Sequence, residues 1–539
     1  MAPENHDIAG QAGKLDSERI EVVPQDNPDH STTKGLDKAA QFLQQANRAV
    51  VIGPEDDKRV LRKIDWAILP IVLLVYALQS LDKTSLSYAA VFGLIDDTGL
   101  VGDQYSWLGS VVYLAQLVMQ PAVAVCLVKF PIGKFTGVMV FCWGATLCGM
   151  AAAKDFGGLM ATRFLLGAFE ASVAPAFIAI VQMWYRRGEQ TNRNAAWYAT
   201  LGVVNILGSL LSYGLGHIQS DALHSYQIIF LFCGLLTVIV AVFVFLFLPD
   251  SPMEAKFLKG DDKLIAVERL RANQMGVASR VWKWEHVWET LLDVKTWLWF
   301  TMIMAISIPS GGVSTFGPLL IKSFGFDSFK TILLQMPFGA VQIISTLGGA
   351  ALATWLKKKS PVLILLCIPP IVGIFMLMFI EYNASNRGVL LFGYYLISVY
   401  PGITPLIYSW EAQNTGGDTK KKVTTGILFV GASVGNVVGP LLYKPSEAPH
   451  YSRGLRSNLA LFLALIVLIC ITVCWIRILN AKHAKQRELN GKSAHVVDRS
   501  MEKPVDSKAD ELESPQNETE DKGFHDVTDL KNEDFIYLY

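Results

Sequence analysis

Long apolar stretches repeat along most of this chain and leave few folds open to it. Between residues 64 and 480 we count roughly twelve of them, each about 20 residues long, the length that a helix needs to cross a hydrocarbon core of about 30 Å. A backbone within lipid must satisfy its own hydrogen bonds, so each stretch is expected to be a helix. The composition agrees, since 52% of the residues are hydrophobic and only 17% are charged. These features predict an all-α membrane protein.

The predicted spans form two sets of six around a polar centre. The first set is expected at 64–87, 105–127, 133–153, 157–184, 195–217 and 226–249. The second set is expected at 296–321, 329–356, 361–381, 388–413, 423–443 and 457–480. We therefore predict twelve transmembrane helices in two pseudo-symmetric six-helix bundles, 61–249 and 296–481, with a cytoplasmic central loop at 250–295. A disordered cytoplasmic N-terminal tail is expected at 1–60. An acidic, disordered cytoplasmic C-terminal tail is expected at 482–539.

Basic residues in the short loops predict the orientation, because Lys and Arg are retained on the cytoplasmic side. The first sixty residues lack the apolar core of a signal peptide, so both termini are expected in the cytoplasm. The even-numbered loops are basic as this requires, with Lys129, Lys134, Arg186, Arg187, Arg193, Lys357, Lys358, Lys359, Lys420, Lys421 and Lys422. An external loop contains the sequon Asn383-Ala384-Ser385, which makes Asn383 a possible glycosylation site.

Several classes of function are disfavoured by what the sequence lacks. The formal net charge is zero, so no overall basic field would attract nucleic acid. We find no phosphate-binding loop, no HExxH or paired CxxC spacing and no nucleophile elbow. The seven cysteines lie in or beside apolar stretches, which argues against a disulfide framework. An enzyme, a bound cofactor and a metal site are therefore not expected.

Span four contains the strongest candidate site, the cation Arg163 and the carboxylate Glu170. Nearly two helical turns separate them, so they share one helix face, and Gly167 leaves room beside that face. Arg163 could bind a substrate carboxylate, while Glu170, partly withdrawn from water, could take up and release a proton. The alternative is a structural ion pair; we favour function, because ionisable residues inside a membrane are usually functional.

Further candidates lie on spans one, two and seven. Lys83, near the end of span one, could attract an anion, or its long side chain could reach out to the membrane interface, and the sequence does not separate the two. Tyr113 and Ser314 are added as candidate substrate-binding residues. In span seven, Pro309 interrupts the helical ladder beside Gly311 and Gly312.

The break in span seven predicts a gating bend, although a kink required only for packing is the alternative. In span eleven, Gly431, Gly435 and Gly439 recur at a spacing of four residues and leave one helix face bare. This pattern is typical of close helix packing.

Several of these motifs, in this order, resemble the major facilitator superfamily, and within it the anion:cation symporter family with its fungal allantoate-permease branch. The similarity covers about residues 60–482 and rests on Leu81-Asp82-Lys83, Arg163 to Glu170, Leu248-Pro249-Asp250-Ser251-Pro252, and Ser409 to Asn414 with Gly416 and Lys420-Lys421. The family often has Arg where Lys83 stands and Asn where Ser85 stands. Lysine lacks the bidentate fork of arginine, so the resemblance specifies the identity of the substrate less closely.

The resemblance implies proton-coupled uptake of a small organic anion by alternating access, with Arg163, Lys83 and Glu170 at the positions of the family's substrate and proton residues. Allantoate, ureidosuccinate, nicotinate, pantothenate and other carboxylates are the substrates it suggests, and the plasma membrane is the location. We expect a monomer that contacts the lipid bilayer, its anion and a proton. An exporter of drugs or secondary metabolites is one alternative, and a non-transporting nutrient sensor is another.

Overall fold

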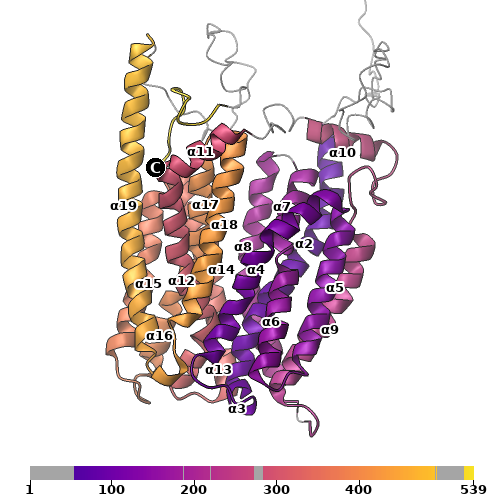
Figure 1. Ribbon diagram of the computed structural model, residues 1–539, viewed down its shortest axis with the longest axis vertical. Coiled ribbons are helices and arrows are strands. Elements are labelled where there is room, and N and C mark those ends of the chain that lie inside the picture. The colour runs from indigo at the N-terminus through magenta and orange to yellow at the C-terminus, as the bar shows by residue number, and fades with distance from the viewer. Residues whose placement is uncertain (1–53, 186, 219, 272–282, 492, 494–526) are drawn as a thin grey trace, which may run out of the picture.

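The computed structural model describes residues 54–185, 187–218, 220–271, 283–491, 493 and 527–539. Within these residues every regular element is a helix, which confirms the all-α class (Figure 1). Most of the expected N-terminal tail, residues 1–53, lies outside the described part, and residues 54–60 already belong to the first long helix.

The first bundle contains the six helical units predicted for it. They are α2 (Pro54–Val91), α4 (Gln104–Lys129), α5 (Ile132–Met150), the pair α6 (Phe156–Glu170) and α7 (Val173–Trp184), α8 (Arg187–Gly216) and α9 (Ser225–Phe247). A short helix, α3 (Leu94–Asp97), follows α2. Span four is thus divided at Ala171–Ser172, directly after Glu170, which the apolar pattern did not predict.

The second bundle repeats this plan with more interruptions. Its units are α12 (Val294–Ser323), the pair α13 (Ser328–Leu333) and α14 (Met336–Leu356), α15 (Ser360–Phe379), the group α16 (Arg387–Ile397), η2 (Tyr400–Gly402) and α17 (Ile403–Gln413), α18 (Asp418–Leu441) and α19 (Ser452–Leu489). The short η3 (Pro445–Glu447) joins α18 to α19, and α10 (Asp261–Arg271) and α11 (Trp284–Leu292) lie in the central loop. By length and composition, ten of the described units could cross a membrane, and α8 adds a shorter apolar helix, Thr200–Gly216.

The bundles stand side by side, with α3 and α13 at one end and α10 and α11 at the other (Figure 1). We call these the α3/α13 end and the α10/α11 end. Near the α3/α13 end, Lys322 Nζ and Ser328 Oγ both donate hydrogen bonds to the carbonyl of Val91. Helix α4 also contacts the second bundle, since Tyr105 Oη donates to the carbonyl of Thr315 at 2.8 Å and Ser110 Oγ to that of Val437 at 2.7 Å.

Glycines allow α18 to pack closely against α12. A Cβ on Gly435 would lie 2.7 Å from Ser307 Cβ and 2.8 Å from the Met304 carbonyl oxygen, and Gly431 and Gly439 face the same helix. The helix α12 is continuous through Pro309, and Gly311 and Gly312 meet Asn436 and Tyr443 rather than open space. These contacts agree with the packing alternative for span seven; a gating role for Pro309, Gly311 and Gly312 stays a prediction.

The chain beyond residue 481 is more ordered than its acidic composition suggested. Helix α19 continues to Leu489. Residues 527–539 pack against the α10/α11 end of the second bundle (Figure 1). Thr528 and Asp529 are fully buried there. The expected disorder is therefore wrong for these two segments, because specific polar partners hold a sequence whose overall composition is hydrophilic.

Candidate functional site

Arg163 and Glu170 lie on α6, buried where α6 meets α4. The close approach depends on Gly167, because a Cβ there would lie 2.8 Å from Val112 Cα on α4. The helix begins at Phe156, where the side chain of Asp155 accepts a hydrogen bond from the Gly158 amide at 3.2 Å. The local sequence thus fixes one face of α6 against α4 and brings both charged groups into the bundle.

Two amide side chains hold the Glu170 carboxylate. Gln116 Nε2 on α4 donates a hydrogen bond to Glu170 Oε2 at 3.0 Å, and Gln79 Nε2 on α2 donates to the same oxygen at 3.5 Å. The other oxygen, Oε1, has no hydrogen-bond partner in the described residues. Neutral donors orient a carboxylate without cancelling its charge, so Glu170 is positioned yet available to a proton or a ligand.

Arg163 is equally buried, with 2% of its surface exposed. Its Nε and one of its terminal nitrogens have no hydrogen-bond partner among the described residues, and no ion pair there joins it to Glu170. A structural ion pair, the alternative considered above, would place the two groups in contact. An unpaired guanidinium inside a protein is costly, so its planar donors are most simply explained as a site for an anionic ligand.

Lys83 is turned toward the same place. Its Nζ lies 5.5 Å from the centroid of the Tyr113 ring on α4, a cation–π geometry, and its charge acts on Glu170. Reaching out to the membrane interface would separate Lys83 from both groups. The structure therefore brings Lys83, Tyr113, Arg163 and Glu170 together, although they come from α2, α4 and α6.

Among the described residues, no contact joins Ser314 to this cluster. It lies half-buried on α12 and makes no hydrogen bond there. Its neighbour Thr315 is the residue that meets α4, through the carbonyl that accepts from Tyr105. Asn383, the possible glycosylation site, is exposed in the loop before α16, and its Oδ1 accepts a hydrogen bond from Ser385 Oγ at 2.9 Å.

Asp82 is the main residue of this site that the sequence reasoning did not assign. It is completely buried on α2, neither carboxylate oxygen has a hydrogen-bond partner in the described part of the chain, and it interacts electrostatically with Glu170 and Arg163. The signal was present, since Asp82 is a charged residue next to Lys83 within an apolar stretch. Two buried carboxyl groups and one buried guanidinium therefore share this region.

Tyrosines from both bundles lie near one another beside this site, and they were also missed. Tyr113 lies near Tyr76 of α2 and Tyr400 of η2 in the other bundle, and Tyr408 of α17 lies near Tyr76 and Tyr198. Phenol groups can donate hydrogen bonds and offer aromatic faces to a planar ligand. No single span reveals such a set, because its members meet only when the two bundles are assembled.

Two six-helix bundles with unpaired buried charges between polar and aromatic side chains define a multi-pass membrane transporter. The chain belongs to the Major Facilitator Superfamily, whose family model matches residues 72–440. This membership confirms that it is a transporter rather than an enzyme.

Individual relatives agree with the family. The chain is 30% identical to the allantoate permease of Saccharomyces cerevisiae over 93% of this chain and 90% of that protein, which confirms the expected kinship. It is 32% identical to the thiamine pathway transporter THI73 of the same yeast, over 93% of this chain and 94% of the relative. Among solved structures, the xylose transporter XylE from E. coli shares the fold, with a TM-score of 0.57 at 10% identity, over 75% of this chain and 96% of XylE.

Proposed function

We propose that this transporter imports a small organic anion together with a proton. The observation that carries the proposal is the burial of Arg163 and Glu170 on one face of α6 without a bond between them. A buried cation with free donors fits a substrate carboxylate, and a buried carboxyl group held by neutral amides fits a proton. A site built only for structural stability would pair the two with each other.

In this proposal each charged residue has a separate role. Arg163 binds the anionic group of the substrate, Lys83 draws it in from the side of Tyr113, and Glu170 carries the proton. Asp82 is a second protonatable group, close enough to Glu170 and Arg163 for the charge of one to affect the others. Binding of a proton to a carboxyl group would lower the negative charge near Arg163 and so favour entry of the substrate anion.

The substrate class follows from the charges and from the relatives. Allantoate is an organic anion, and the similarity to an allantoate permease supports a carboxylate of that kind, with nicotinate, pantothenate and ureidosuccinate as further candidates. We propose further that the transporter is a monomer in the plasma membrane, with both ends of the chain in the cytoplasm. In that orientation the α10/α11 end is cytoplasmic, and the contacts at the α3/α13 end close the external side.

Uptake driven by a proton should rise as the external pH falls, and it should depend on Glu170. We expect uptake of labelled allantoate or a related carboxylate, in yeast without its own related permeases, to be several-fold faster at pH about 5 than at about 7. Glu170→Gln retains hydrogen bonding but cannot exchange a proton, so its uptake should lose this pH response. The measurement is initial uptake rate against external pH.

The matched control is Glu381→Gln, the same chemical change at an exposed loop position. It should preserve both the rate and the pH response of the parent. Uptake that is independent of pH in the parent would contradict the proton coupling. Lower cellular accumulation of the labelled compound than in cells without the protein would instead indicate export and overturn the direction proposed here.

A further inference from the structure

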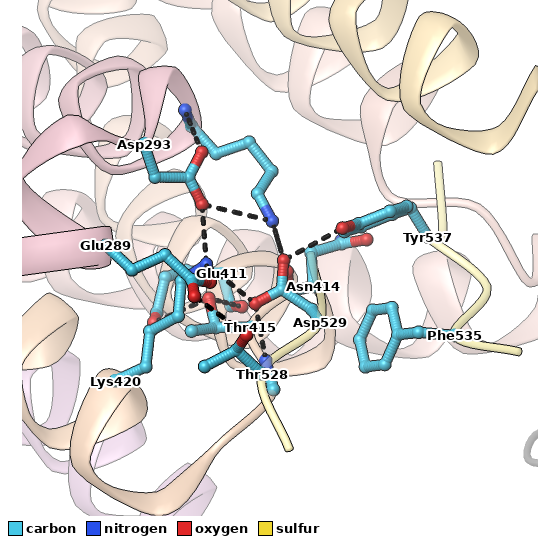
Figure 2. A network of polar contacts seen from close by, with 12 residues as sticks. Glu289, Asp293, Glu411, Asn414, Thr415, Lys420, Thr528, Asp529, Phe535 and Tyr537 are labelled. Carbon is cyan, nitrogen blue, oxygen red and sulfur yellow. Dashed lines mark hydrogen bonds and ion pairs between the residues drawn. The ribbon is translucent and has the colours of Figure 1, made fainter. Parts of the chain in front are cut away.

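The segment 527–539, which we call the docked segment, carries an acidic residue into the centre of a buried charge cluster. Asp529 is fully buried; its Oδ1 lies 3.0 Å from Lys420 Nζ, and its Oδ2 pairs with Lys295 Nζ and accepts from Tyr537 Oη at 2.9 Å (Figure 2). The amide of Gly416 also donates to Asp529 Oδ1 at 3.0 Å. Each oxygen of this carboxylate thus has at least one partner far away in the sequence, and Tyr537 of the same segment adds another.

Charge balance makes Asp529 an integral part of this cluster. Lys295 and Lys420 are each about 1% exposed, so their charges need partners inside the protein. Glu289 and Asp293 supply two, since Lys420 Nζ lies 2.9 Å from Glu289 Oε1 and 2.8 Å from Asp293 Oδ2. Asp293 and Asp529 each contact both lysines, so Asp529 is one of two carboxylates that bridge them. Thr528 adds a hydrogen bond to Glu289 at 2.9 Å.

Neutral side chains recognise the backbone of the docked segment. Asn414 on the α17–α18 loop accepts from the amide of Leu538 at 2.8 Å and donates to its carbonyl at 3.1 Å. Asn480 on α19 does the same for Tyr537, at 3.0 and 2.9 Å. Trp410 Nε1 also donates to the Leu538 carbonyl at 2.8 Å. Paired amide contacts of this type are how proteins bind an extended peptide, while the anchoring side chains give specificity.

These contacts also explain the motif from Ser409 to Lys420, which the transport site does not use. Trp410, Asn414, Gly416 and Lys420 each bind the docked segment, and all four lie at the α10/α11 end, away from Arg163. The motif is therefore a receptor for a peptide bearing a buried aspartate and an aromatic residue eight positions later, Tyr537.

The docked segment connects the helices that also form the interface with the first bundle. Lys295 lies in the first turn of α12 and Lys420 in the first turn of α18. Farther along the same two helices, Thr315 of α12 and Val437 of α18 accept hydrogen bonds from α4. Asp529 thus adds to the Asp293–Lys420 ion pair in joining the starts of two helices whose other halves meet the first bundle.

We propose that residues 527–539 are an intramolecular peptide ligand for the α10/α11 end of the second bundle, and that docking favours closure of the two bundles at the α3/α13 end. This regulation goes beyond the proposed uptake and does not depend on the identity of the substrate. Release of the segment would free α12 and α18 to shift against each other and would weaken their joint contact with α4.

The ion pair that holds the segment is complete at neutral pH. Burial acts to raise the pKa of Asp529, but the ammonium groups of Lys295 and Lys420 outweigh it and hold that pKa below its ordinary value. A carboxyl group of this kind stabilises the docked state above the pKa of the free group, about 3.9, and the stabilisation is lost as the pH falls through the lowered value. The Asp529 carboxylate should therefore stay ionised, and its ion pairs intact, between about pH 6 and 8.

Limited proteolysis of the purified full-length chain tests the docking. Trypsin can cleave after Lys531, whose side chain is 57% exposed, but only when the surrounding segment leaves its site. We expect cleavage there, followed by mass spectrometry, to be about tenfold faster in Asp529→Asn than in the parent. Asn480→Ala should also accelerate cleavage, because it removes two hydrogen bonds to the backbone of Tyr537. This variant leaves no buried lysine unpaired, so it still tests the docking if Asp529→Asn fails to fold.

The control for this experiment is Glu488→Gln, a carboxylate-to-amide change at an exposed position of α19. It should leave the cleavage rate unchanged. Equal rates in the parent, Asp529→Asn and Asn480→Ala would overturn the docking. If dilution of the protein removed the protection of Lys531 from trypsin, the docked segment would come from a second copy of the chain. That result would overturn the proposal that the ligand is intramolecular.

A cysteine pair reports the coupling independently of transport. Lys444 Nζ lies 3.8 Å from Asp103 Oδ2 across the two bundles. A bifunctional thiol reagent about as long as these two side chains together should therefore join Asp103→Cys to Lys444→Cys when the α3/α13 end is closed. We expect the cross-linked fraction to fall by about half when Asp529→Asn or Asn480→Ala is added. An unchanged fraction, together with faster cleavage after Lys531, would overturn the coupling between the two ends.

Discussion

Replacing Arg163 with alanine should reduce uptake of the anionic substrate by about a hundredfold or more. Arg163 is buried, and its Nε and one terminal nitrogen have no protein partner in the described residues, so a substrate carboxylate would be their counter-charge. Removing the guanidinium leaves the anion with a desolvation cost and no bidentate partner. Arg163→Lys keeps the charge but loses the planar fork, so it should fall between the parent and Arg163→Ala.

Initial uptake rates, normalised to the amount of protein in the membrane, measure this effect. Arg456→Ala is the matched control, because it removes the same side chain from an exposed position on α19. It should transport at the parental rate. If Arg163→Ala transported normally while Arg456→Ala did as well, Arg163 would have a structural role, and the anion site would have to lie elsewhere.

The fold could be predicted from the sequence because lipid imposes a strict rule on the backbone. Each apolar stretch of about 20 residues had to become a helix, and the polar centre around 250–295 divided the chain into two halves. This rule does not predict where a transmembrane helix is interrupted. The break after Glu170 and the 3₁₀ turn Tyr400–Gly402 lie within stretches that remain apolar, so their hydropathy resembles that of an unbroken helix.

Part of the candidate site was predictable for a related reason. A charge in an apolar stretch is rare and costly, and this alone directed attention to Arg163, Glu170 and Lys83. The same argument applies to Asp82, which stands beside Lys83 in the same apolar stretch. Gln79, Gln116 and Tyr400 could not be inferred in this way, since polar uncharged residues are common in spans and their partners lie on other helices.

The docked segment shows where composition misleads. Acidic, polar sequence lacks the apolar surface that normally drives folding, so disorder was the reasonable expectation. Asp529 instead gains its stability from two buried lysines, Lys295 and Lys420, which lie more than a hundred residues away in the sequence. In the sequence, Lys420 indicates only topology, as one of three lysines in a basic loop. Its burial, which sequence alone does not reveal, is what gives it a second role.

The contact between α12 and α18 should be the part of the second bundle most sensitive to added volume, and Gly435→Leu tests it. A Cβ on Gly435 would already lie 2.8 Å from the backbone oxygen of Met304, so a leucine must force the two helices apart. We expect a loss of stability of about 3 kcal/mol or more, measured as a lower thermal unfolding temperature of the purified protein.

Gly426→Leu is the control on the same helix, since a Cβ on Gly426 meets nothing within 4 Å. Because the docked segment fixes the starts of α12 and α18, Gly435→Leu should also speed cleavage after Lys531, whereas Gly426→Leu should not. Equal unfolding temperatures for the two leucine variants would show that the helices can separate at little cost.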